Sequence, residues 1–340
     1  MHEFPLIEVS GDARQMGRQH GEQAAPLIRR YLDWIEKSCG RPRDALTAGA
    51  LEFLPHIEAL SPRYAEEVRG LAEGAAISFE EALLCQVRGE AARAAPEGCT
   101  AFALTGTATA DGAPLAGQNQ DLPPEFGDLG IVLHVKPTDG RPRAMTFTFA
   151  GQLGYMGTNE HGVSHFANGL NGPWSPGLPH YPLKRVLLEQ RDVGACLDIL
   201  RRHPACSCAN MVFCDGGGRI ADAEIAPGRV LLQGEDRADA RLHTNHWLHP
   251  EFARGQAAFA EESRLRLERV RALVGRHWGA VDVGVLQEIL ADHEGDPGAI
   301  CRHGEGGTHS VAGYIAEPAK GLFHVRRGHG CSGSWRAYEV

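Results

Sequence analysis

Residues Gly98, Cys99 and Thr100 place a thiol directly after a glycine, about thirty per cent of the way along the chain. A cut between Gly98 and Cys99 would turn the cysteine into a new N-terminus. Such a residue carries both parts of a nucleophilic catalyst, because its thiol attacks a carbonyl carbon while its free α-amine, with a pKa of about 7.7 to 8, accepts the proton. We therefore predict self-cleavage before Cys99 and catalysis by its thiol.

Gly98 supports this prediction because a residue without a side chain lets the bond before Cys99 bend into a strained conformation that the thiol can attack. The simpler explanation is a strand that starts after a turn, since free cysteines are often buried. The flanking sequence favours a catalytic role for Cys99 over a structural one. Residues 94–98 are typical of an exposed, easily cut loop, and a turn at Asp111 before residues 114–121 indicates a hairpin whose first residue is the thiol.

The composition indicates an ordinary globular protein. Of the 340 residues, 43% are hydrophobic and 23% are charged, which is enough for a large core. The net charge of -9, with no basic run, argues against nucleic acid and anionic membranes as partners. With neither a signal peptide nor a long apolar run in view, we expect a soluble, cytoplasmic protein.

The nine cysteines show no framework spacing and are predicted to be mostly free thiols. The densest cluster runs from Cys196 to Cys214. Within it Cys206 and Cys208 are separated by one residue, which is tighter than the usual spacing of a zinc knuckle. We therefore assign this cluster to packing and expect neither a metal nor a cofactor.

Residues 1–98 are predicted to be mainly helical after a short strand over 7–9. Asp12 and Gln15 form a capping-box pattern that starts a long helix, and Gly40 begins the break that ends it. A second helix is predicted to end before Pro55, and two more begin at Ser61 and Ser78.

Strands dominate after Cys99. They are predicted over 131–135, 144–149, 163–167, 211–214, 220–225, 310–316 and 321–325, with helices over 182–191, 193–202, 264–278 and 283–290. Groups of strands that alternate with pairs of helices favour a four-layer αββα sandwich, an α+β fold in which two sheets face each other. We predict one compact unit, with residues 99–340 as its catalytic part.

Seven motifs along the chain, taken in order, resemble the acyl-coenzyme A:6-aminopenicillanic acid acyltransferase family of autoproteolytic N-terminal nucleophile (Ntn) hydrolases, also described as peptidase family C45. Each motif is weak alone, but their order is specific. They are Gly17–Gly21, Gly98–Thr100, Gly117–Asp121, Asn159–Gly162, His243–His246, Ile300–Arg302 and Ser334–Tyr338.

The resemblance implies an αββα sandwich made of two pieces that stay together as a heterodimer after the cut, with 1–98 as the pro-segment. It implies that Cys99 is the nucleophile and that Asp121 orients and charges the amine of Cys99. It also implies that Asn245 donates to the oxyanion, as an uncharged amide can without a proton transfer, and that Arg302 lies near the active centre. Weaker candidates for substrate binding are Thr100, Asn119 and Asn168.

Each of these residues also has an ordinary structural explanation. Asp121 could be a turn carboxylate, Asn245 a strand-end residue and Arg302 a surface charge. One residue departs from the family pattern: Gln120 stands where the family commonly has an aromatic residue, so we do not transfer the penicillin-forming substrate.

We predict an amidohydrolase or acyltransferase that acts on a small N-acyl amide or peptide-like substrate through a thioester on Cys99. The alternatives are an acyl-coenzyme A-dependent N-acyltransferase with the same nucleophile, a papain-like cysteine hydrolase assisted by histidine, and a ligand-binding protein without activity. The histidines that raise the papain-like alternative are His20, His161, His243, His246, His303 and His309. The predicted partners are the small acyl substrate and the pro-segment, and a homo-oligomer is left open.

Overall fold

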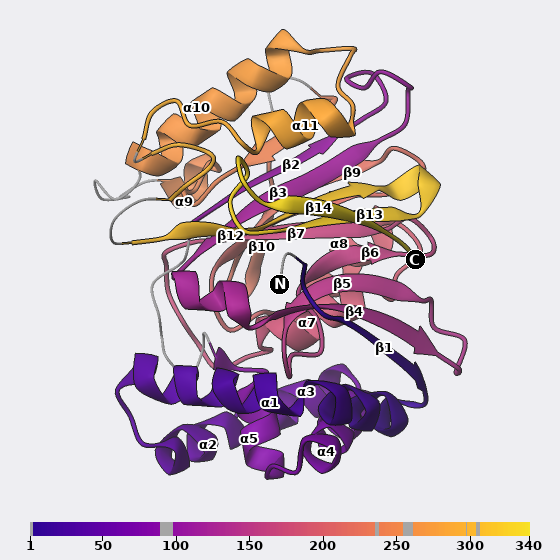
Figure 1. Ribbon diagram of the computed structural model, residues 1–340, viewed down its shortest axis with the longest axis vertical. Helices are drawn as coiled ribbons and strands as arrows, with labels where there is room; N and C mark the ends of the chain where they lie inside the picture. The colour runs from indigo at the N-terminus through magenta and orange to yellow at the C-terminus, as the bar shows by residue number, and fades with distance from the viewer. Residues whose placement is uncertain (1–2, 89–97, 235–237, 254–260, 297, 304–306) are drawn as a thin grey trace.

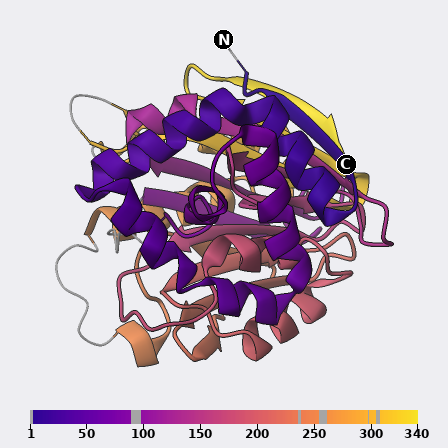
Figure 2. The same ribbon diagram turned by 90° about the horizontal axis from the view of Figure 1, so that it is seen from below.

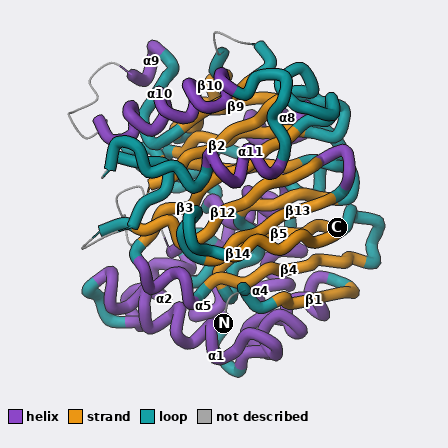
Figure 3. Tube along the Cα trace, turned by 45° about the horizontal axis from the view of Figure 1, so that its top comes forward, coloured by secondary structure: helices purple, strands orange, loops and turns teal. Residues whose placement is uncertain are grey.

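The computed structural model describes residues 3–88, 98–234, 238–253, 261–296, 298–303 and 307–340. Two β-sheets lie face to face and helices cover the outer side of each (Figure 1; Figure 3). The layers follow the order helix, sheet, sheet, helix, so the predicted αββα sandwich is confirmed. The part of the predicted cutting loop that precedes Gly98 lies outside the described residues.

The strands are β1 (Leu6–Gly11), β2 (Gly98–Leu104), β3 (Leu115–Leu122), β4 (Gly130–Pro137), β5 (Ala144–Phe149), β6 (Met156–Asn159), β7 (Ser164–Gly169), β8 (Ala209–Cys214), β9 (Ile220–Ala226), β10 (Arg229–Leu232), β11 (Ala240–His243), β12 (His309–Glu317), β13 (Leu322–Arg327) and β14 (Ser334–Glu339). The helices are α1 (Ala13–Cys39), α2 (Arg43–Leu51), α3 (Leu54–Leu60), α4 (Pro62–Ala75), α5 (Phe79–Leu84), η1 (Pro124–Asp128), α7 (His180–Leu187), α8 (Val193–Arg202), α9 (Pro250–Ala253), α10 (Glu261–Arg276), α11 (Val283–Ile289) and η3 (Pro318–Lys320).

The first sheet has the strand order β1-β4-β5-β6-β7-β8-β9-β10, and the second has the order β11-β2-β3-β12-β13-β14. At the edge of the first sheet β1 pairs with β4 in parallel, with Leu6 opposite Val132 and Gly11 opposite Pro137. The segment before Gly98 therefore contributes a strand to the sandwich as well as a layer of helices.

The N-terminal helices lie together over one side of the sandwich (Figure 2). Helix α1 starts at the predicted capping box, in which Asp12 accepts from the backbone of Gln15, and its C-cap is Gly40 with a φ of 59°. Helix α1 crosses α4 at close range, because glycines face backbone there. A Cβ on Gly17 would lie 1.9 Å from the carbonyl oxygen of Glu67. The glycine motif in the opening helix thus has a packing role.

The hairpin of β2 and β3 separates two hydrophobic cores. Successive side chains of a strand point to opposite faces. Ala101 and Ala103 belong to the large core that includes residues of both sheets. Phe102 and Leu104 belong to a second core beneath α10 and α11. Because Cys99 is in phase with the two alanines, its side chain is on the face toward the first sheet.

Several short elements were not predicted, namely α3, α9, β6, β10, β11 and β14. Four of them have only four residues, too few to show a period. The prediction that Pro55 ends a helix was wrong: Pro55 lies in the first turn of α3, where its missing N–H costs no hydrogen bond. No helix among the described residues is long and apolar enough to cross a membrane.

Candidate active site

Cys99 is the second residue of β2, a strand flanked on both sides within its sheet. It pairs with Gln120 of β3 and is 2% exposed. Its polar groups contact side chains from three separate elements. The backbone N–H donates to Asn245 Oδ1 at 2.7 Å, and Gln120 Nε2 donates to Sγ at 3.2 Å. The carbonyl oxygen accepts a short hydrogen bond from Arg266 of α10. Cys99 is thus held at its amide, its carbonyl and its thiol.

Asn245 follows β11 and faces the amide of Cys99 with its side-chain oxygen. This orientation is set by chemistry, because Oδ1 accepts from two donors, the N–H of Cys99 and Nη2 of Arg266 at 3.0 Å. Asn245 Nδ2 donates to the carbonyl of Gly169 at 3.1 Å, and the backbone N–H of Asn245 donates to Ser263 Oγ at 2.7 Å. The structure therefore brings Asn245 to Cys99, with the carbonyl side of the amide toward the cysteine.

Asp121 lies opposite Gly98 in the β2–β3 ladder and is fully buried. Ser310 Oγ donates to its Oδ1 at 2.6 Å. Within the described part of the chain, no hydrogen-bond partner reaches Oδ2. Burial raises the pKa of Asp121, although the positive charge of Arg266 and the hydrogen bond from Ser310 oppose this change. Among the described residues, the carboxyl group therefore has one oxygen without a hydrogen-bond partner, and its affinity for a proton is raised.

Gly98 is closely surrounded by two of the predicted site residues. A Cβ at this position would lie 3.0 Å from Nη1 of Arg302 and 3.2 Å from Oδ2 of Asp121. A side chain would therefore crowd both charged groups. Arg302 also donates to Glu262 at 2.8 Å, and its side chain is only 16% exposed, which fits a site arginine better than a surface charge.

The three weaker candidates have different surroundings. Thr100 Oγ1 accepts from Arg266 at 3.2 Å. Asn119 lies on the opposite face of β3 from Gln120 and donates to two backbone carbonyls, those of Leu290 and Ile300. Asn119 thus links β3 to the segment after α11.

Asn168 of β7 lies close to the loop that carries Asn245. Its Nδ2 donates to the carbonyls of His243 and Thr244 at 2.9 and 3.0 Å. Asn168 Oδ1 is buried without a hydrogen-bond partner among the described residues. Asn168 is therefore positioned to fix the backbone immediately before Asn245.

Arg266 is the functional residue that sequence reasoning missed. It is 2% exposed and contacts Cys99, Thr100 and Asn245. Burial lowers the pKa of Arg266, while the negative charge of Asp121 opposes this change. Helical spacing could have predicted the burial of Arg266, because this residue falls on the buried stripe of α10 with Val270. The contact from Gln120 to Sγ could not be derived from the sequence, which gives no register.

The histidines close to Asn245 in sequence are engaged elsewhere. His243 Nδ1 bonds the carbonyl of Thr244 at 2.7 Å, and Nε2 bonds Glu224 Oε1 at 2.9 Å. His246 Nδ1 bonds Ser263 Oγ at 2.8 Å. Because His243 uses both ring nitrogens, it does not offer one to a thiol, as the papain-like alternative requires.

The cysteines between Cys196 and Cys214 are buried free thiols. Cys196 Sγ donates to the carbonyl of Leu187, and Cys208 Sγ donates to that of Pro173. In the described ranges these thiols do not converge into a metal-ligand group.

Two facing sheets with helices on both outer sides define the class as the αββα fold of Ntn hydrolases. A variant of the conjugated bile acid hydrolase of Clostridium perfringens has a similar fold, with a TM-score of 0.50 and 13% sequence identity over 71% of this chain and 97% of that chain. Penicillin V acylase of Agrobacterium tumefaciens gives a TM-score of 0.47 and 10% identity over 71% and 86% of the two chains.

The family model described as acyl-coenzyme A:6-aminopenicillanic acid acyl-transferase matches residues 107–323, and the chain belongs to this family. The matched range begins after Cys99 and includes Asp121, Asn168, Asn245 and Arg302. The chain is also 26% identical over 251 residues to the 40 kDa form of acyl-coenzyme A:6-aminopenicillanic-acid-acyltransferase of Emericella nidulans, covering 71% of this chain and 69% of that protein. The prediction of an acyltransferase or hydrolase that acts on amide bonds is thereby confirmed, and the non-enzymatic alternative is wrong.

Proposed function

We propose that this enzyme cuts its own chain between Gly98 and Cys99 and then uses the new N-terminal cysteine to cleave a small N-acyl amide or peptide-like substrate. One observation carries the proposal. A buried carboxylate oxygen without a hydrogen-bond partner among the described residues, Asp121 Oδ2, lies beside the residue that precedes the thiol. This oxygen can accept a hydrogen bond from the α-amine of Cys99, a donor that forms only when the chain is cut.

In the self-cleavage step, Cys99 Sγ attacks the carbonyl carbon of Gly98. The bond from this carbon to the nitrogen of Cys99 breaks, and the nitrogen receives the thiol proton, so an amide becomes a thioester. Water then hydrolyses the thioester and leaves a carboxylate on Gly98 and a free amine and thiol on Cys99. The hydrogen bond from the backbone N–H of Cys99 to Asn245 Oδ1 fixes the departing nitrogen, and Arg302 places positive charge beside Gly98.

In turnover, the free amine of Cys99 takes the thiol proton as the thiol attacks the substrate carbonyl. The amine thereby becomes cationic, and Asp121 stabilises that charge. Nδ2 of Asn245 donates to the oxygen of the tetrahedral intermediate. Arg266 does not act on the substrate in this scheme. It positions the carbonyl of Cys99 and the side chain of Asn245.

The pro-segment, residues 1–98, stays bound after the cut in our proposal. Its strand β1 pairs with β4 along six residues, and α1 packs against the same sheet edge. Tyr31, Leu32 and Ile35 of α1 are buried in the large core. Dissociation would expose this apolar surface, so the two pieces form a stable heterodimer.

We favour hydrolysis over acyl transfer because water needs no second binding site. A coenzyme A donor would profit from a basic groove for its phosphates, whereas the chain has a net charge of -9. All nine cysteines are free thiols, which supports a reducing compartment and a cytoplasmic location.

The test of this function is a panel of N-acyl amides given to the purified enzyme with and without excess acceptor amine. We expect hydrolysis of part of the panel and loss of all activity in Cys99→Ala. Acyl transfer that outcompetes hydrolysis at modest amine concentration, or dependence on an acyl-coenzyme A donor, would replace the hydrolase by an acyltransferase while retaining Cys99. Full activity of Cys99→Ala would refute the nucleophile.

A further inference from the structure

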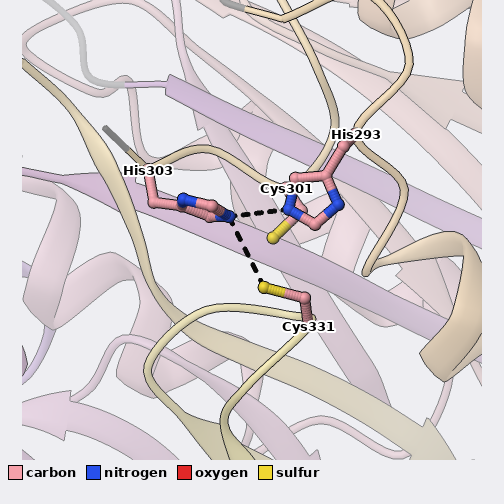
Figure 4. A group of neighbouring side chains, drawn as sticks. All are labelled: His293, Cys301, His303 and Cys331. Atoms are coloured by element: carbon pink, nitrogen blue, oxygen red, sulfur yellow. Dashed lines mark hydrogen bonds between the residues drawn. The ribbon is translucent and has the colours of Figure 1, made fainter. Parts of the chain in front are cut away.

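Two histidines and two cysteines meet on the side of the second sheet that carries α11. His293, Cys301 and His303 lie in the segment between α11 and β12, and Cys331 lies in the turn between β13 and β14 (Figure 4). The Cys301 side chain is buried and the other three are exposed. The four residues thus come from two segments that are distant in sequence.

The side chains converge through their metal-binding atoms. His293 Nε2 lies 2.7 Å from His303 Nε2, and Cys331 Sγ lies 3.4 Å from the same nitrogen. All four ligand atoms lie within 4.8 Å of one another. In a tetrahedral zinc site, bond lengths of about 2.0 to 2.3 Å place the ligands about 3.3 to 3.8 Å apart. Small side-chain rotations bring the present arrangement to that geometry.

We propose that His293, Cys301, His303 and Cys331 bind one Zn²⁺ ion in a closed, tetrahedral structural site. Two thiolates and two imidazoles form a ligand set that is typical of structural Zn²⁺ sites. The negative charges of the two thiolates balance the charge of the ion.

The sequence did not reveal this site because its ligands are not arranged as two close pairs. Cys301 and His303 are separated by one residue, and Cys331 follows only after two strands. The ion would join the segment after α11 to the β13–β14 turn. Arg302, which lies beside Gly98, stands between two of the ligands. The zinc site would therefore fix the backbone that carries Arg302.

Metal binding is tested on the full chain with Zn²⁺ and with Co²⁺ as a spectroscopic substitute. We expect one equivalent of zinc in protein purified from zinc-supplemented medium. After removal of zinc by a chelator, Co²⁺ should give the thiolate charge-transfer band and the visible bands of a tetrahedral ion, and Zn²⁺ should displace it. Cys331→Ser and His293→Ala, both at exposed positions, should each weaken Co²⁺ binding about a hundredfold or more.

Cys39→Ser and His56→Ala serve as matched controls, because they remove a thiol and an imidazole outside the cluster. Both should bind Co²⁺ like the unmodified chain. A Co²⁺ spectrum without a thiolate band, or unchanged binding in Cys331→Ser, would overturn the proposal. A disulfide between Cys301 and Cys331 in freshly purified protein would also overturn it and assign the pair to redox chemistry.

Discussion

At the scale of single residues, the site holds a buried carboxyl group, that of Asp121, among buried arginines. Arg266 and Arg326 are almost fully buried and favour the charged form of Asp121, whereas desolvation favours its neutral form. Desolvation outweighs the arginines, so the pKa of Asp121 is raised in the folded chain. The protonation of this carboxyl group is therefore suited to respond to a change of charge on the amine of Cys99.

Asn245→Ala tests the oxyanion role. If Nδ2 stabilises the tetrahedral intermediate, kcat should fall by about a hundredfold to a thousandfold with little change in KM. Steady-state kinetics on the cleaved enzyme separate the two constants. A rise in KM alone would make Asn245 a pocket residue, and Asn168→Ala, which removes a support of the same loop, should give a smaller loss of kcat.

Gln120→Met tests whether the amide of Gln120 activates the thiol. Methionine keeps the approximate shape but removes the N–H that donates to Cys99 Sγ, so the thiolate loses a stabilising partner. We expect the rate of alkylation of Cys99 by iodoacetamide at neutral pH to fall about tenfold. Gln118→Met, which removes the donor to Gln120 and the acceptor of the Ala167 N–H, should have a smaller effect on this rate, and an unchanged rate in Gln120→Met would exclude the role.

At the scale of elements, the crossing of α1 and α4 depends on glycines. Gly17→Ala would place a Cβ against the carbonyl of Glu67 and should lower the free energy of unfolding by about 1 to 3 kcal/mol. Gly49→Ala in α2 is the matched control, because nothing lies within 4 Å of its Cβ, and it should raise stability by about 0.5 to 1 kcal/mol. Urea unfolding measures both, and equal effects would contradict the close crossing.

The two sheets are joined by a buried pair, His243 of β11 and Glu224 of β9. Burial opposes the charge on the ring, but Asp222, Glu224 and the carbonyl of Thr244 outweigh it, so the pKa of His243 is raised and that of Glu224 is lowered. A raised histidine pKa gives stability that is fully present below about pH 6.5 and is lost as pH rises through the folded value.

Thermal unfolding of the unmodified chain and of His243→Gln should therefore differ most near pH 6 and converge toward about pH 9. His246 is a further ionisable group near this pair; its pKa is lowered to about 4 by burial and by the charge of His243, so it stays neutral over this range. A difference between the two proteins that is constant with pH would show that His243 is not charged in the folded chain.

Some of the elements could be predicted from the sequence and others could not. The helix starts at Asp12 and Ser78 and the β2–β3 hairpin were predicted because their signals are local. Short strands such as β11 were missed, although β11 carries the chain to Asn245. The meeting of Arg266 with Cys99 depends on how α10 docks on the second sheet, which no local pattern encodes.

At the scale of the whole molecule, the segment before Gly98 is an integral part of the sandwich. It supplies the edge strand β1, a layer of helices and buried side chains of the large core. The chain can therefore fold as one unit before any cut. In our account the fold brings Asn245, Arg266 and Asp121 to Gly98 and Cys99, and this assembled site then cuts the bond between them.

Intact mass spectrometry of the purified protein tests this account most directly. From the mass of 36.7 kDa for the whole chain, the account predicts two pieces of about 11 and 26 kDa, the larger beginning at Cys99. Cys99→Ala should remain a single chain. A full-length, uncut chain that hydrolyses its substrate would contradict the account, because the amine on which catalysis depends would never have formed.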